Sequence, residues 1–241
     1  MKSTFLVTAL AGLFASQAAV AQDQRPSPAQ LPMPAAAPDP ATDQQNLVNL
    51  DLSSGGRVVL QLRPDVAPNH VARMKALICR GFYDGIIFHR VIDGFMAQAG
   101  DPTGTGEGGS DLPDLKAEFN LLPHLRGTVS AARTNDPDTA NSQFFIMLMP
   151  RTTLDRRYTV YGRVISGMQY VDAIEKGEPP ANPSKILKAT LAGGCAGVPT
   201  APAPVAPAPA PAAPVATPPA AEAAPLPAEP TTPEEPATPP Q

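Results

Sequence analysis

Three short apolar segments in the middle of the chain carry the side chains whose types and spacing suggest chemistry. In a strand, alternate side chains lie on opposite faces. The face of the first strand that carries Arg90 must be open to water or a partner, because the side chain is charged. By the same alternation, Met96 and Gln98 share a face of a second strand, and Gln143 and Phe145 share a face of a third. If these strands adjoin, one surface collects a cation, two amides and two apolar groups. Such a surface suits an apolar group held between hydrogen-bonding side chains.

Nucleophilic and metal chemistry have weaker support. A serine or cysteine nucleophile needs a base within hydrogen-bond reach and a third group that orients the base. The three histidines, His70, His89 and His124, fall on a predicted helix, a strand face and a loop, each without a recognisable partner pattern. We interpret them as structural or solvated. The acidic residues at 111–118 lack the ligand spacing of an EF-hand, so we expect no metal and no cofactor.

The elements that must position these side chains follow from apolar periodicity. Apolar residues alternate over 48–52 and 58–62 around a Gly-Gly turn, which predicts a strand pair. Pro68 then opens a helix that ends at Gly81, and a second helix is predicted over 168–175. Six further short apolar runs predict strands of a mainly β sandwich or barrel: 86–92, 95–99, 127–132, 144–149, 159–165 and 186–191.

Composition divides the 241 residues into four parts, because the 32 prolines concentrate towards the two ends. Residues 1–21 have the charged, apolar and small-residue regions of a signal peptide. Residues 22–45 and 196–241, rich in Ala and Pro and without aromatic residues, predict disordered extensions. Only 46–195 can build a core, so we expect one folded domain and an acidic, proline-rich tail.

Charge and cysteine content limit the partners. The net charge of −4 and the lack of a clustered basic face exclude nucleic acid as an expected partner. No later segment approaches the length of a membrane-spanning helix. Cys79 and Cys195 have neither metal-site nor thioredoxin spacing. In an oxidising compartment they could pair, but two buried free thiols would look the same in sequence.

The three blocks that carry the candidate residues resemble the signature blocks of the cyclophilin-type peptidyl-prolyl cis-trans isomerases. The blocks are 88–101, 130–146 with its Asn-Ser-Gln-Phe-Phe-Ile sequence, and 154–167, and the resemblance covers about residues 45–194. It implies a closed eight-stranded antiparallel β-barrel capped by two α-helices. It also implies an isomerase that acts on proline-containing unfolded or partly folded polypeptides and needs no cofactor.

Position by position, the resemblance makes Arg90 the catalytic arginine. The residues it assigns to substrate binding, either in the proline pocket or along the peptide, are Phe95, Met96, Gln98, Ala132, Gln143, Phe145, Leu154 and Tyr158. Well-known eukaryotic members carry a tryptophan at the position of Thr153, whereas this chain has no tryptophan, and a histidine at the position of Tyr158. Because the tryptophan ring serves cyclosporin, we expect weak cyclosporin binding.

The sequence therefore predicts a monomeric isomerase that assists the folding of exported proteins. The signal peptide places it in the periplasm, with secretion as the alternative. Two rival hypotheses remain: a binding module or chaperone that uses the groove without turnover, and an envelope scaffold in which the proline-rich tail is the functional part.

Overall fold

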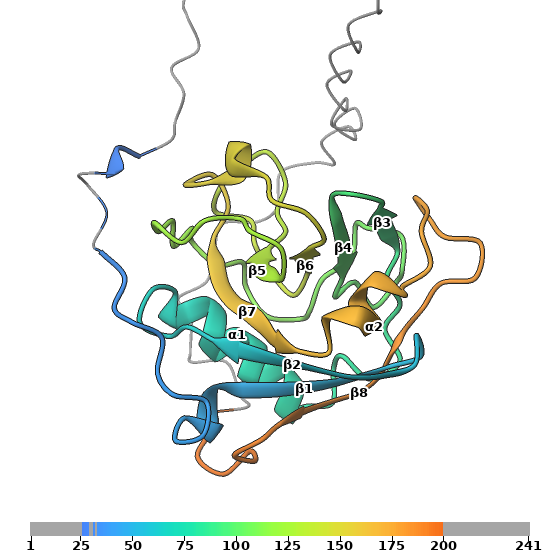
Figure 1. The fold of residues 1–241 in the computed structure, drawn as a ribbon, viewed down its shortest axis with the longest axis horizontal. Helices are drawn as coiled ribbons and strands as arrows, with labels where there is room; N and C mark the ends of the chain where they lie inside the picture. Colours follow the sequence, from blue (N-terminus) through green and yellow to red (C-terminus); the bar gives the residue numbers. More distant parts are fainter. Residues whose placement is uncertain (1–25, 29–30, 32, 200–241) are drawn as a thin grey trace, which may run out of the picture. The chain divides into compact units, whose positions relative to one another are not determined.

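The computed structural model describes residues 26–28, 31 and 33–199 (Figure 1). The predicted signal peptide and nearly all of the predicted tail lie outside them. Along the described chain run β1 (Leu47–Leu52), β2 (Gly56–Leu62), α1 (Pro68–Cys79), β3 (Arg90–Ile92), β4 (Met96–Ala99), β5 (Thr128–Ala131), β6 (Phe144–Met147), β7 (Val160–Ser166), α2 (Met168–Asp172) and β8 (Ile186–Leu191). No helix in this part is long and apolar enough to cross a membrane.

The strand pair and the first helix predicted from the sequence are confirmed. Val48 of β1 lies opposite Leu60 of β2, and the alternating apolar residues of both strands are buried on one face. α1 has Pro68 in its first turn, where the missing N–H has no helical acceptor to lose. Its buried face includes Val71, Met74 and Leu77.

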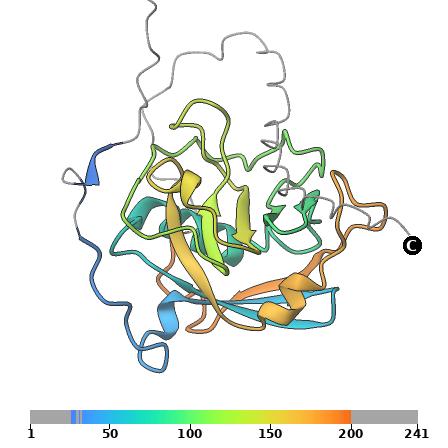
Figure 2. The ribbon, with the colours of Figure 1, turned by 45° about the horizontal axis from the view of Figure 1, so that its top comes forward.

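All eight strands belong to one antiparallel sheet in the order β3-β4-β6-β5-β7-β2-β1-β8. The sheet is curled but open between β3 and β8, so the closed barrel expected from the family resemblance is not observed (Figures 1 and 2). Two isolated bridges, Ile87 to Lys185 and Val91 to Gly177, span this gap. A continuous ladder cannot form there because prolines occupy positions 179, 180 and 183, and proline has no N–H to donate.

The third predicted strand, 86–92, is much shorter than expected. Only β3 is regular strand, whereas the residues before it make single hydrogen bonds to the start of β8 and the residues just ahead of it. Phe88 N donates to Ser184 O at 2.8 Å, and Gly85 N donates to Ile186 O at 2.7 Å. These contacts keep Arg90 at the end of the sheet nearest the gap.

The sheet separates two apolar clusters, as the alternation of β6 predicts. Phe144 and Ile146 join the large core between the sheet and α1. Phe145 and Met147 face the other way and join Met96 in a small second cluster. The second cluster is the base of the candidate site.

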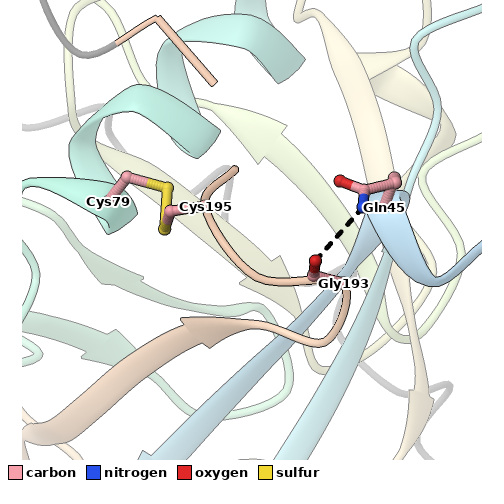
Figure 3. The surroundings of a disulfide bond; sticks show 4 residues. All are labelled: Gln45, Cys79, Gly193 and Cys195. Carbon is pink, nitrogen blue, oxygen red and sulfur yellow. Dashed lines mark hydrogen bonds between the residues drawn. A yellow bond between two sulfur atoms is a disulfide. The ribbon is translucent and has the colours of Figure 1, made fainter. Parts of the chain in front are cut away.

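The two ends of the domain are tied to its body. Cys79, the last residue of α1, is disulfide-bonded to Cys195, 116 positions away (Figure 3). Next to this bond, the Gln45 side chain donates a hydrogen bond to Gly193 O at 3.2 Å. The pairing that the sequence left open is therefore present in the structure.

Part of the predicted disordered linker contacts the sheet. The guanidinium of Arg63 donates to Ala35 O at 2.6 Å, and the amide of Gln61 donates to Pro38 O at 2.6 Å. Both donors are almost fully buried. We call residues 33–43 the N-terminal strap, because these hydrogen bonds hold it against the end of β2.

Candidate active site

The second cluster opens into a pocket of about 90 Å³. Its lining residues are Phe95, Met96, Gln98, Ala132, Arg133, Phe145, Leu154 and Tyr158. Seven of these eight are residues that the sequence predicted for substrate binding, and the structure brings them together from the β3–β4 turn, β4, β6 and the segments after β5 and before β7.

Aromatic and aliphatic side chains form the walls of this pocket. The rings of Phe145 and Tyr158 meet edge to face with centroids 5.6 Å apart. Met96 is buried beneath them, and Leu154 packs against the same cluster. Leu154 O accepts hydrogen bonds from Arg157 N and Tyr158 N, so a tight turn presents Leu154 and Tyr158 to one cavity. A rigid apolar pocket of this kind suits a small apolar ring.

Two amide side chains fix the polar edge of the site. Gln98 Nε2 donates to Gln143 Oε1 at 2.8 Å. Gln143 Nε2 in turn donates to Gly106 O at 2.9 Å and to Gly108 O at 2.8 Å. These bonds set the orientation of both amides. Gln143, which is not part of the pocket wall, therefore acts on the site through Gln98 and the 103–108 loop.

The buried carboxylate of Asp101 organises that loop. Its Oδ1 accepts hydrogen bonds from the backbone and hydroxyl of Thr103, both at 2.7 Å, and its Oδ2 accepts one from Gly106 N at 2.6 Å. Burial raises the pKa of Asp101, but these hydrogen bonds outweigh it and lower the pKa to about 2. The carboxylate is thus charged at neutral pH. It fixes the loop whose glycine carbonyls accept hydrogen bonds from Gln143.

Arg90 lies beside the pocket rather than in its wall. It is directly opposite Gln98 in the β3–β4 ladder, and its side chain is 30% exposed. Arg90 Nε donates to Glu178 Oε2 at 2.6 Å. Since a guanidinium has five N–H donors, this ion pair leaves others for a ligand.

His124 has partners that the sequence did not reveal. Its Nδ1 lies 2.9 Å from Asp155 Oδ1, and its Nε2 lies 3.0 Å from Ser130 Oγ. Burial lowers the pKa of His124 more than the hydrogen bond and charge of Asp155 raise it. Although the three residues form a Ser-His-Asp row, Ser130 is fully buried and cannot meet a substrate. The imidazole instead stacks on Phe145, with centroids 6.1 Å apart, and supports the pocket floor.

The other two histidines also lie inside the domain. His70 Nδ1 is 2.6 Å from Glu118 Oε2, a contact across 48 positions that no local pattern indicates. His89 is buried, and desolvation lowers its pKa. Within the described residues, no group of three or more His, Cys, Asp or Glu side chains could hold a metal ion.

Arg133, the eighth residue of the pocket, is not among the site residues predicted from the sequence. Its guanidinium carbon lies 4.5 Å from the ring centroid of Tyr158, a cation–π distance. Arg151 has the same relation to Phe95, at 4.8 Å. The position of Arg133 directly after Ala132 was the only available signal, because its contact with Tyr158 spans a segment whose path sequence does not reveal.

The curled antiparallel sheet thus combines an apolar pocket with two fixed amides and a neighbouring arginine. The family model described as "Cyclophilin type peptidyl-prolyl cis-trans isomerase/CLD" matches residues 47–191. The chain therefore belongs to the cyclophilin-type peptidyl-prolyl cis-trans isomerases.

Similar proteins agree with this assignment. A "Probable peptidyl-prolyl cis-trans isomerase" of Brucella suis is 49% identical over 167 residues, covering 63% of this chain and 85% of the relative. Peptidyl-prolyl cis-trans isomerase ppi1 of Schizosaccharomyces pombe is 36% identical over 152 residues, covering 59% of this chain and 98% of the relative.

Solved structures show the same fold. Cyclophilin AquaCyp293 from Hirschia baltica matches with a TM-score of 0.57 and 32% identity over 62% of this chain and 74% of that one. A Cryptosporidium parvum cyclophilin crystallised in the presence of the dipeptide Ala-Pro matches with a TM-score of 0.57 and 29% identity, over 60% and 98% of the two chains.

Proposed function

We propose that this isomerase accelerates rotation about Xaa-Pro bonds during the folding of exported proteins, by non-covalent stabilisation of the twisted amide. The observation that carries the proposal is the placement of Arg90 opposite Gln98, beside a preformed apolar pocket. The cyclophilin structure obtained with Ala-Pro supports a proline ligand for the corresponding domain here.

Rotation about an Xaa-Pro bond breaks amide resonance and meets a barrier of about 20 kcal/mol. As the bond twists, the proline nitrogen becomes pyramidal and gains a lone pair. A guanidinium that donates a hydrogen bond to this nitrogen stabilises the twisted state more than the planar one, which lowers the barrier. Arg90 suits this role because it stays charged and retains donors beyond the Nε that binds Glu178.

The remaining site residues would bind the two sides of the Xaa-Pro bond separately. Phe145, Leu154 and their neighbours would grip the proline ring, while Gln98 and the backbone at Ala132 would hold the adjoining peptide. One side can then turn against the other. No bond to the protein forms, and no proton is transferred.

The test is cis-to-trans isomerisation of an Ala-Pro peptide by the wild-type chain and by Arg90→Ala. We expect kcat/KM to fall at least about tenfold, or about 1.4 kcal/mol, in the folded variant. Arg163→Ala is the matched control, since Arg163 is an exposed arginine of β7 outside the pocket lining. A folded wild type without any acceleration would instead favour a binding module.

Export and the site of action are part of the proposal. The signal-peptide pattern of residues 1–21 and the Cys79–Cys195 disulfide both suit an oxidising compartment, which favours the periplasm over a reducing cytosol. Cell fractionation followed by N-terminal sequencing should find the chain in the periplasm, beginning at Gln22. A cytosolic chain that begins at Met1 would refute this part.

Two further properties belong to the proposal: the protein is a monomer, and it binds cyclosporin weakly. Thr153 occupies the position at which well-known eukaryotic members carry tryptophan, and it is exposed in the 3-10 turn Thr152–Leu154. Inhibition of the isomerase should therefore require much more cyclosporin than for a member with that tryptophan. Sedimentation at equilibrium gives the oligomeric state.

A further inference from the structure

The rim of the pocket carries two arginines that are not paired with any carboxylate of the described residues. Arg133 borders the pocket over Tyr158, and Arg151 lies over Phe95, another lining residue. Among the residues that the structure describes, neither arginine forms an ion pair. Tyr158 and Phe95 are both pocket residues, so both guanidinium groups lie within reach of a peptide bound in the pocket.

Most arginines elsewhere in the described domain are neutralised. Five of them form ion pairs with carboxylates: Arg57 with Asp51, Arg63 with Asp65, Arg80 with Asp111, Arg90 with Glu178 and Arg126 with Asp172. Arg133 and Arg151 differ from these five in having no carboxylate partner among the described residues, and both lie at the pocket rim.

Two acidic residues near the rim are already paired with other side chains. Glu178 is matched by Arg90, and the carboxylate of Asp155 is turned towards buried His124. Asp93, in the exposed β3–β4 turn, is the other acidic residue close to Phe95 in sequence. Arg133 and Arg151 therefore place two guanidinium charges at the rim that form no ion pair with a described carboxylate.

We propose that this rim selects substrates in which an acidic residue flanks the proline, with Arg133 and Arg151 as the specificity-determining residues. The inference rests on the proposed isomerase function and adds the class of peptide that the site prefers. Peptides with basic flanking residues are the disfavoured class.

The two arginines contribute in different ways. Arg133 donates to three backbone carbonyls, those of Thr134, Asn135 and Arg157, so its guanidinium is a fixed point charge. Arg151 is exposed, and its stacking on Phe95 leaves its N–H groups to donate to a carboxylate of the peptide. A charge held near the pocket by the fold acts without the entropic cost of ordering a free side chain.

The first measurement compares kcat/KM of the mature chain for two sets of test peptides. One set has Glu, Gln or Lys directly before the proline, and the other has them directly after it. In at least one set we expect Glu to exceed Lys about tenfold at low ionic strength, with Gln between them. In about 1 M salt, where the Debye length is about 3 Å, the difference should nearly vanish.

Variants assign the preference to residues. Arg151→Gln and Arg133→Gln should each reduce the ratio of Glu to Lys about threefold, whereas Arg163→Gln, which removes the same charge from β7, should leave it unchanged. Arg151→Glu should reverse the preference. Because Arg151 makes no structural ion pair, its variants test the proposal even if Arg133→Gln does not fold.

Two outcomes overturn the inference without affecting the proposed function: equal acceleration of Glu, Gln and Lys peptides in both sets, or a preference for Glu that Arg163→Gln reduces as much as Arg151→Gln does. A failure of the proposed function looks different, because then no peptide of either set would be accelerated.

Discussion

Asp101 lies behind the candidate site, and it touches neither the pocket nor Gln98. Its carboxylate accepts hydrogen bonds from the 103–108 loop. The carbonyls of Gly106 and Gly108 in this loop accept hydrogen bonds from the Gln143 side chain. The Gln143 side chain in turn accepts a hydrogen bond from the side chain of Gln98, which lines the pocket. A single buried charge therefore fixes the polar edge of the site through a loop and two amides.

This arrangement predicts that Asp101→Asn weakens both stability and activity. Because the pKa of Asp101 falls from 3.8 to about 2 on folding, its ionised form contributes about 2 kcal/mol to the free energy of unfolding at neutral pH. That contribution is complete above about pH 4 and is lost as the pH falls towards 2. Urea unfolding at pH 7 should show the full loss in the variant, together with a several-fold drop in kcat/KM.

Asp93→Asn is the matched control, since it removes an exposed carboxylate from the β3–β4 turn and should change the stability little. If Asp101→Asn unfolds at the same urea concentration as the wild type at pH 7, the role given to this carboxylate is wrong.

Individual residues also show what sequence can and cannot predict about the site. Alternation along β4 and β6 correctly placed Gln98 and Phe145 on one face, because neighbouring strands follow a fixed two-residue period. Asp155, which contacts His124, and Tyr158, which contacts Arg133, lie in a loop whose course no periodicity determines. Asp155 lies 31 positions from His124, and only the folded chain brings the two together.

At the scale of elements, regular segments were predicted well and their margins were not. β8 has the predicted bounds, 186–191, because it pairs with β1 over its whole length, with one register shift between Asp51 and Leu52. β3 and α2 are shorter than their apolar runs. The gap between β3 and β8 depends on whether two distant segments form a ladder. The apolar pattern of either segment alone does not predict this pairing.

The N-terminal strap gives a prediction for an element without regular structure. Deleting residues 22–40 removes the carbonyls that accept hydrogen bonds from Arg63 and Gln61, so each of these buried side chains loses one hydrogen bond, although Arg63 keeps its ion pair with Asp65. Since each such loss costs about 1 kcal/mol, the free energy of unfolding should fall by about 2 kcal/mol. Chemical denaturation measures this fall.

Because the acceptors are main-chain carbonyls, Ala35→Gly together with Pro38→Ala should cost much less than the deletion. Equal losses in the two variants would show that the side chains of the strap, and not its backbone, stabilise the domain.

At the scale of the whole molecule, the disulfide links the end of α1 to the chain that follows β8 and so encloses most of the folded domain. A cross-link between such distant positions restricts the unfolded chain strongly. In the chain-entropy account, a loop of this length contributes about 4 to 5 kcal/mol. For a domain whose total stability is on the order of 10 kcal/mol, this is a large share.

Cys79→Ser together with Cys195→Ser should therefore lower the denaturant midpoint strongly and leave isomerase activity at 25 °C nearly intact, since neither cysteine lies in the pocket lining. Reducing the wild type with dithiothreitol should give the same midpoint as the double variant, because both lose the same cross-link. An unchanged midpoint in both would mean that the unfolded chain is already compact enough for the link to add nothing. A lower midpoint with lost activity would instead mean that a shift of α1 displaces Phe145 through the core. Phe145 lies on the opposite face of β6 from Phe144, which packs in that core.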